Sequence, residues 1–126
     1  MLTILAALAL QASTPAGSAA SAAPAPERLA GSWTVDLSVS PAQPYAQPMT
    51  LTLNADGTVS GSFYQSDIQS GRWRAQNGRL CASFQTTDGR GPYQTTACAT
   101  EDGRVQGQTW AEHRRFVFLW TATRAG

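Results

Sequence analysis

The sequence predicts an all-β protein, a single up-and-down antiparallel eight-stranded barrel. From Trp33 onward apolar and polar residues alternate, which is the period of a strand with one buried face. Gly, Asn and Asp interrupt the alternation at regular intervals, and no stretch sustains the apolar stripe of a helix. Eight strands joined in sequence lose both exposed edges if the first pairs with the last.

The chain is predicted to begin with a signal peptide, residues 1–22, followed by a disordered Ala/Pro linker, residues 23–30. The apolar run LTILAALAL (2–10) has signal-peptide length and is shorter than the about 20 residues that span a membrane. Small residues between Ser18 and Ala23 offer cleavage sites. The run has no Lys or Arg before it, so an uncleaved or misannotated start is the alternative. We expect a periplasmic or secreted protein without a stable membrane anchor.

The barrel domain is predicted to span residues 31–124. Its short turns carry Gly, which supplies the positive φ that tight turns require; they are NADG (54–57), QNGR (76–79), TDGRG (87–91) and EDGR (101–104). The proline-rich connection 40–48 is longer and could fold across one end. The predicted strands are 32–39, 48–54, 58–65, 69–75, 79–86, 92–100, 104–111 and 115–124.

Each hairpin predicts which residues lie opposite one another, and all hairpins must agree on one inner face. The turn between the third and fourth strands is centred on Ser66 in this scheme. Glycines repeatedly face bulky residues, which is the filling expected inside a narrow barrel. The predicted opposite pairs are Leu53–Val59, Leu51–Gly61, Met49–Phe63, Gly61–Gly71, Val59–Trp73, Trp73–Ala82, Gly71–Phe84 and Ala82–Ala97.

The turn at 101–104 allows two registers. A two-residue turn at 102–103 turns inward Trp110, Val117 and Leu119. A three-residue turn ending at 103 turns inward Phe118 and Trp120. We favour the second, because it gives Gly107 a bulky partner, Trp120. Both faces of the last strand are apolar, so this strand is either covered by the neck of the chain or buried in a subunit contact. The residues left outside form a patch that indicates a homo-oligomer contact: Trp110, Val117 and Leu119.

Cys81 and Cys98 are predicted to form a disulfide. They are the only cysteines, they lie directly opposite each other in the predicted register, and exported proteins keep such pairs oxidised. The bridge would lie on the outer face and close a loop of roughly 18 residues, which contributes about 3 kcal/mol in the chain-entropy model. Two Cys and one His are too few ligands for a metal site.

Composition and spacing disfavour several function classes. A net charge of +1 without a basic cluster gives no support to nucleic-acid binding. The single histidine, His113, lies in the turn EHRR and is interpreted as solvated. No register brings two carboxylates together, and no Ser has a His partner. We therefore expect neither an enzyme nor a cofactor; the aspartates Asp56, Asp88 and Asp102 are interpreted as turn formers, and Asp36 as an outward residue.

The first and last strands resemble those of the calycin superfamily, which contains lipocalins, avidins and small periplasmic protease inhibitors. The shared features are GSW (31–33) at the start of the first strand and WTATR (120–124) at the end of the last. The resemblance implies a calycin-like barrel in which Trp33 plugs one end and Arg124 stacks over it. Such a cation–π contact contributes about 1 kcal/mol or more.

Within that superfamily, GSWTVDLS (31–38) and LNADGTVSGSFY (53–64) are most similar to the avidins. The biotin contacts of that family are not retained. Val35 and Phe63 stand where the family has hydrogen-bonding side chains, and only Ser38 could keep its role. Because each unpaired polar contact costs about 1–3 kcal/mol, avidin-like biotin binding is not expected.

The inward aromatic residues allow two interpretations. They could line an apolar ligand pocket, with Tyr45 of the long loop as a further contact, or they could fill a solid core. Phe118 faces inward with them. The candidate ligand-binding residues are Trp33, Val35, Tyr45, Phe63, Trp73, Phe84 and Trp120.

Three functional classes are compatible with such a barrel. The favoured one is a non-catalytic barrel that binds a small apolar or amphipathic ligand. The second is a protein-binding barrel, such as a periplasmic protease inhibitor that inserts the extended segment before Leu29. The third is a structural envelope protein with no small ligand.

Overall fold

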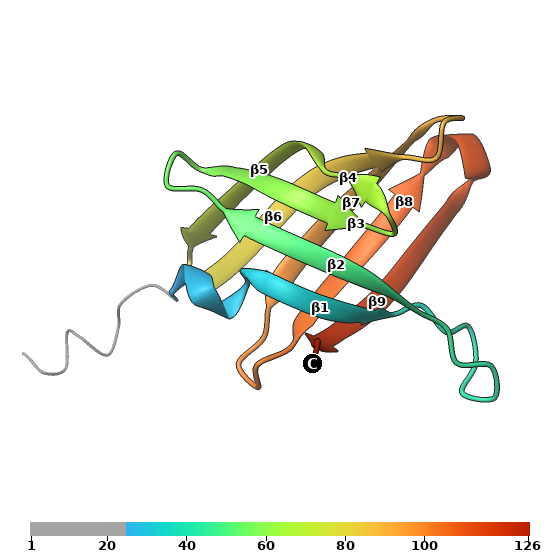
Figure 1. Ribbon diagram of the computed structural model, residues 1–126, viewed down its shortest axis with the longest axis horizontal. Coiled ribbons are helices and arrows are strands. Elements are labelled where there is room, and N and C mark those ends of the chain that lie inside the picture. Colours follow the sequence, from blue (N-terminus) through green and yellow to red (C-terminus); the bar gives the residue numbers. More distant parts are fainter. Residues whose placement is uncertain (1–24) are drawn as a thin grey trace, which may run out of the picture.

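One antiparallel β-sheet closes into a barrel (Figure 1). The computed structural model describes residues 25–126, so the predicted signal peptide and its cleavage sites lie outside the described residues. A 3₁₀ turn, η2 (Pro26–Arg28), precedes the sheet, and a second, η3 (Glu112–Arg114), lies before the last strand. The strands are β1 (Gly31–Asp36), β2 (Ala46–Leu53), β3 (Thr58–Phe63), β4 (Ser66–Asp67), β5 (Gln69–Gln76), β6 (Arg79–Thr87), β7 (Pro92–Ala99), β8 (Val105–Ala111) and β9 (Phe116–Arg124).

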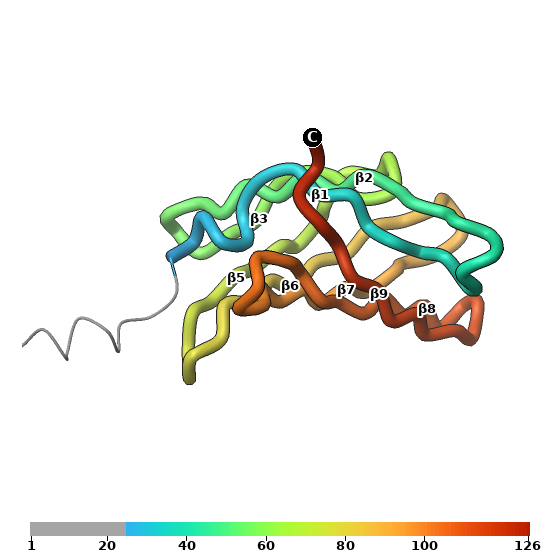
Figure 2. The backbone as a smooth tube through the Cα atoms, turned by 90° about the horizontal axis from the view of Figure 1, so that it is seen from below, coloured from blue at the N-terminus to red at the C-terminus, as the bar shows by residue number. Residues whose placement is uncertain are grey.

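The pairing order confirms the predicted eight-stranded barrel. Neighbours follow the order β2-β1-β9-β8-β7-β6-β5-β3-β4, and β2 also pairs with β3, which closes the sheet. The two-residue β4 and β5 both pair with β3, so together they occupy one strand position. β1 and β9, the first and last strands, run side by side (Figure 2). Val35 of β1 lies opposite Ala122 of β9.

The barrel has two different ends. We call the end with the β2–β3, β5–β6 and β7–β8 turns and residues 25–30 the closed end. We call the end with the β1–β2, β3–β4, β6–β7 and β8–β9 turns the open end (Figure 1).

Most of the predicted opposite pairs are present in the sheet, including Met49 opposite Phe63 and Trp73 opposite Ala82. Val105 lies opposite Ala99, which confirms the favoured three-residue turn before β8.

The predicted register between the third and fourth strands is wrong. Val59 pairs with Gly71, not with Trp73. The chain turns at Tyr64–Gln65, before Ser66, and both turn residues have positive φ, 58° and 61°. Gly71 therefore does not pair with Gly61. The β5–β6 ladder shifts between Gln69 and Arg72, so the predicted pair of Gly71 with Phe84 is absent as well. Positive φ is uncommon for residues other than Gly, Asn, Asp and His. Because Tyr64 and Gln65 belong to none of these types, the sequence carries no turn signal at this position.

The segment before the barrel is ordered where the structure describes it, which differs from the predicted disordered linker. Pro26–Arg28 form a 3₁₀ turn, and Leu29 is 0% exposed within the core cluster. The carbonyl of Leu29 accepts a hydrogen bond from Trp33 Nε1 at 2.9 Å. The apolar Leu29 side chain supplies the burial that the neighbouring Ala and Pro residues cannot.

The proline-rich connection between β1 and β2 does not fold across one end of the barrel, as the sequence analysis allowed. The β1–β2 connection projects beyond the open end rather than crossing it (Figure 1), and Val39 in it is 79% exposed. Hydrogen bonds between Ser38 and Tyr45 extend the β1–β2 hairpin and direct the loop outward.

The apolar residues predicted to lie on the outer face do so: Trp110, Val117 and Leu119 are exposed. A contact between copies of the chain through this patch stays a prediction.

Gly107 of β8 makes room for the largest inward ring of β9. It lies opposite Trp120, and an added Cβ would be 2.3 Å from Trp120 Cζ2. We expect Gly107→Ala to lower the free energy of unfolding by about 1–3 kcal/mol, because overpacking a filled core forces side chains off their rotamers. Urea titration followed by Trp fluorescence measures this. Gln108→Ala, on the outer face of the same strand, should change stability by less than about 0.5 kcal/mol; equal midpoints for the two variants would contradict the packing role.

Candidate ligand-binding site

Trp33 and Arg124 seal the closed end in the way that the calycin resemblance implies. Trp33 is 1% exposed, and the guanidinium carbon of Arg124 lies 4.1 Å from the centre of its ring. Arg124 also donates hydrogen bonds to the carbonyls of Ala30 and Glu27, both at 2.6 Å. Gly31 has φ of 122°, and a Cβ there would be 2.4 Å from Arg124 Nη1. The Gly of GSW therefore makes room for the arginine, and the Trp is a plug.

The middle of the barrel is solid. Phe63 contacts Phe84 edge-on, with ring centres 6.3 Å apart, and its ring centre is 5.6 Å from that of Trp120. Trp120 Nε1 donates to Thr109 Oγ1 at 3.0 Å, which satisfies the indole N–H inside the core. Of the two sequence interpretations, the filled core thus describes this layer.

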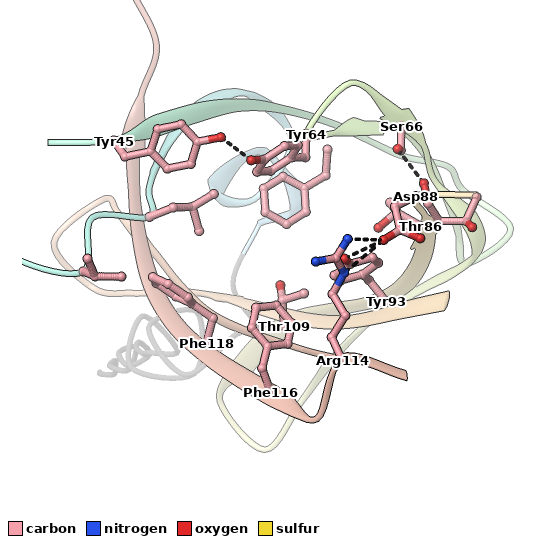
Figure 3. Close-up of a pocket in the computed structure, with 14 residues that line it drawn as sticks. Tyr45, Tyr64, Ser66, Thr86, Asp88, Tyr93, Thr109, Arg114, Phe116 and Phe118 are labelled. Atoms are coloured by element: carbon pink, nitrogen blue, oxygen red, sulfur yellow. Dashed lines mark hydrogen bonds and ion pairs between the residues drawn. The ribbon is translucent and has the colours of Figure 1, made fainter. Parts of the chain in front are cut away.

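Above this layer, the open end contains a cavity of about 580 Å³ (Figure 3). This is within the range of small-molecule sites, about 300–1,000 Å³. Inward positions near this end carry small side chains, Thr86 on β6 and Thr109 on β8, where the layer below carries rings. The space arises from that change in side-chain size. Its apolar wall consists of Leu37, Val39, Phe63, Phe116 and Phe118.

Two tyrosines form a polar site on one wall of the cavity. The Tyr45 and Tyr64 hydroxyls are hydrogen-bonded to each other (Figure 3), and Gln47 Nε2 donates to Tyr45 Oη at 2.9 Å. The bond with Tyr45 raises the pKa of the Tyr64 hydroxyl, and partial burial raises it further. The Tyr64 phenol therefore stays protonated at neutral pH, and a phenol hydroxyl can both donate and accept hydrogen bonds.

A second polar site, around Asp88, lies across the cavity. Asp88 Oδ2 accepts hydrogen bonds from Tyr93 Oη at 2.8 Å and from Arg114 Nε at 3.1 Å, and Arg114 Nη2 lies 3.0 Å away (Figure 3). Asp88 Oδ1 accepts from the backbone N–H groups of Arg90 and Gly91 at 2.8 and 3.1 Å. The N–H of Arg90 holds the pKa of the Asp88 carboxyl well below its usual range, and Tyr93 and Arg114 lower it further. The carboxylate thus stays ionised and joins the β6–β7 turn to η3.

The sequence-predicted ligand residues fall into three places. Tyr45 and Phe63 line the cavity, and so does Phe118. Phe84 and Trp120 belong to the filled layer below it, and Val35 is fully buried in the core. Two others lie toward the closed end: Trp33 is the plug, and Trp73 donates through Nε1 to the carbonyl of Asn54 in the β2–β3 turn at 2.7 Å.

Sequence reasoning missed several residues of the cavity. Asp88 is predicted only as a turn former, and its hydrogen bonds to the backbone of the β6–β7 turn confirm that role. The sequence pattern does not identify Tyr93 and Arg114 as its side-chain partners. A usable signal is present: residues that face inward within about three positions of an open-end turn must line that end. The missed lining residues with polar groups are Tyr64, Ser66, Thr86, Thr87, Asp88, Tyr93, Thr109 and Arg114.

The described residues also bear on other kinds of site. Within 25–126, no three His, Cys, Asp or Glu side chains come together as a metal site would require. The His113 ring lies beside Asp88, with Nε2 3.5 Å from Asp88 Oδ2. Over the same stretch, none of the helical segments has the length and hydropathy needed to cross a bilayer.

Comparison with known proteins gave one match. The family model described as C-terminal lipocalin-like domain, GH43_C, matches residues 15–126. The matched stretch contains every strand of the barrel, the plug and the open-end cavity. No curated protein and no solved structure matches the chain.

Proposed function

Because the chain belongs to the family of C-terminal lipocalin-like domains, GH43_C, we propose that it is a non-catalytic barrel that binds a small amphipathic ligand in the open-end cavity. A lipocalin-like barrel fits a binding role, and the lipocalin-like C-terminal domain is a non-catalytic module. The observation that carries the proposal is the cavity itself: about 580 Å³, open at one end only, with one apolar wall and two polar sites.

The composition of the wall favours an amphipathic molecule over a purely polar one. Each Å² of apolar ligand surface removed from water contributes about 25 cal/mol, before the costs of immobilising the ligand are subtracted. Phe116 and Phe118 offer such contacts near the mouth, and Phe63 offers them at the floor. The hydroxyls of Tyr45 and Tyr64 can orient one polar group of the same ligand.

Binding of the uncharged fluorophore N-phenylnaphthylamine tests the proposal. We expect the fluorescence of this molecule to rise on titration with the protein. Phe118→Ala should raise the Kd of the complex about tenfold, equivalent to about 1.4 kcal/mol of binding free energy. Leu119→Ala is the matched control, because Leu119 is the next residue of β9 and points to solvent. No fluorescence increase, or equal losses in the two variants, would contradict binding in the cavity.

We also propose that the protein is exported. The apolar run at residues 2–10 supports this, and so does the disulfide, which oxidising compartments preserve. In a bacterial host that expresses the full chain, the intact mass of the protein from the periplasmic or culture fraction should correspond to a start between Ser18 and Ala23. Recovery of all the protein from the cytoplasm with Met1 retained would contradict export.

A further inference from the structure

We infer that the ligand of the open-end cavity is an uncharged molecule with a hydroxyl or carbonyl oxygen on an apolar body. This inference rests on the proposed function. It follows from how the charges of the cavity are paired: of the residues that line it, only Asp88 and Arg114 are charged, and they are bound to each other.

The Asp88 carboxylate has no capacity left for a ligand cation. One of its oxygens accepts two backbone N–H groups, at 2.8 and 3.1 Å. The other accepts the Tyr93 hydroxyl and the Arg114 guanidinium, and His113 Nε2 also lies 3.5 Å from it. A carboxylate offers about four lone-pair sites, and all four are occupied here. An ammonium group that entered the cavity would have to displace one of these partners.

The positive charge of Arg114 is likewise neutralised. Its Nε and Nη2 both lie within 3.1 Å of Asp88 Oδ2. The guanidinium is also 6.0 Å from the ring centre of Tyr93, at the edge of cation–π range. The Arg114 side chain is half exposed, so an anionic ligand would give up part of its hydration to meet a pair with no net charge, and such an exchange gains little.

The tyrosine site supplies what a neutral oxygen requires. The two hydroxyls of Tyr45 and Tyr64 carry two hydrogens, and the bond between them uses one. Gln47 fills one lone pair of Tyr45 and accepts no hydrogen from it. One O–H therefore has no protein acceptor among the described residues, and Figure 3 shows this pair at the cavity wall, across from Asp88 and Arg114.

Three ligands with one ring system and different head groups test the charge preference: naphthol, naphthoate and naphthylmethylammonium. At about pH 8 the first is neutral, the second anionic and the third cationic, by the ordinary pKa values of phenols, carboxyls and amines. Each competes with N-phenylnaphthylamine for the full-length protein. We expect naphthol to bind at least about tenfold more tightly than either ion. An ion that binds as tightly as naphthol would overturn the inference.

Two variants that break the charge pair should shift the preference in opposite directions. Asp88→Asn can still accept the backbone N–H groups but frees the charge of Arg114, so naphthoate should gain at least about tenfold relative to naphthol. Arg114→Gln frees Asp88, so naphthylmethylammonium should gain instead. Asp102→Asn is the matched control, since it breaks an exposed Asp–Arg pair of 3.1 Å at the closed end. An unchanged order of affinities in both pocket variants would overturn the inference.

The outcomes separate this inference from the proposed function. If the fluorophore binds and Phe118→Ala weakens it, but the three head groups bind equally, the cavity binds ligands and the inference of an uncharged ligand fails. If neither the fluorophore nor naphthol binds, the proposed function fails and takes the inference with it. Circular dichroism of each variant identifies any that has lost the fold, and the reciprocal variant then decides.

Discussion

Replacement of Trp33 by alanine should lower the free energy of unfolding by about 3–5 kcal/mol, the cost of deleting a large buried ring. The indole is almost fully buried, its N–H bonds to the carbonyl of Leu29, and Arg124 covers its face. The substitution removes all three interactions and opens a void at the closed end. Because the whole stability of a small domain is about 5–15 kcal/mol, this loss would be a large part of it. Urea denaturation followed by circular dichroism measures the change.

Trp110→Ala is the matched control for this prediction. Trp110 is the same residue type on the outer face of β8, and it is 43% exposed. Surface substitutions usually change stability by less than about 0.5 kcal/mol. If Trp110→Ala were as destabilising as Trp33→Ala, the closed end would not depend on the plug.

Removal of the disulfide should have the second large effect. Cys81 and Cys98 lie directly opposite each other on β6 and β7, and the structure confirms the predicted bridge. The double variant Cys81→Ser, Cys98→Ser should lose about 3 kcal/mol, because the unfolded chain is no longer constrained by a loop of about 18 residues. The fold should persist, since both side chains lie on the outer face, away from the core.

Reduction of the wild-type protein provides the control for the double variant. A thiol reductant should lower the urea midpoint of the wild type to near that of the variant, and it should leave the variant unchanged. A wild-type midpoint that does not respond to reductant would show that the bridge contributes nothing to stability.

Closure and most registers could be predicted from the sequence because both depend on local signals. Period-two alternation sets the inner face, and Asn77–Gly78 fixes the β5–β6 hairpin. The error between β3 and β5 occurred where such a signal is missing: Tyr64 and Gln65 adopt positive φ without being Gly or Asn. The ladder interruption near Ser70, which also has positive φ, has the same character.

The candidate site was only partly predictable. Alternation identified Phe63 and Phe118 as inward residues, but it does not say which layer is filled and which is open. That depends on side-chain volumes across strands, where Thr86 and Thr109 leave the open end unfilled. The contact between Asp88 and Arg114 joins two turns 26 residues apart, and no periodicity encodes it. The tyrosine pair likewise joins Tyr45 to Tyr64 across separate loops.

Backbone amide chemical shifts, recorded with and without naphthol, test most directly whether the open-end cavity binds ligands. Tyr64, Thr86 and Thr109 line that cavity, whereas Trp110 and Leu119 lie on the outer face. We predict that saturating naphthol shifts the amides of the first three residues and leaves those of Trp110 and Leu119 in place. Shifts confined to the outer face, or no shifts at a naphthol concentration that displaces the fluorophore, would contradict binding in the cavity.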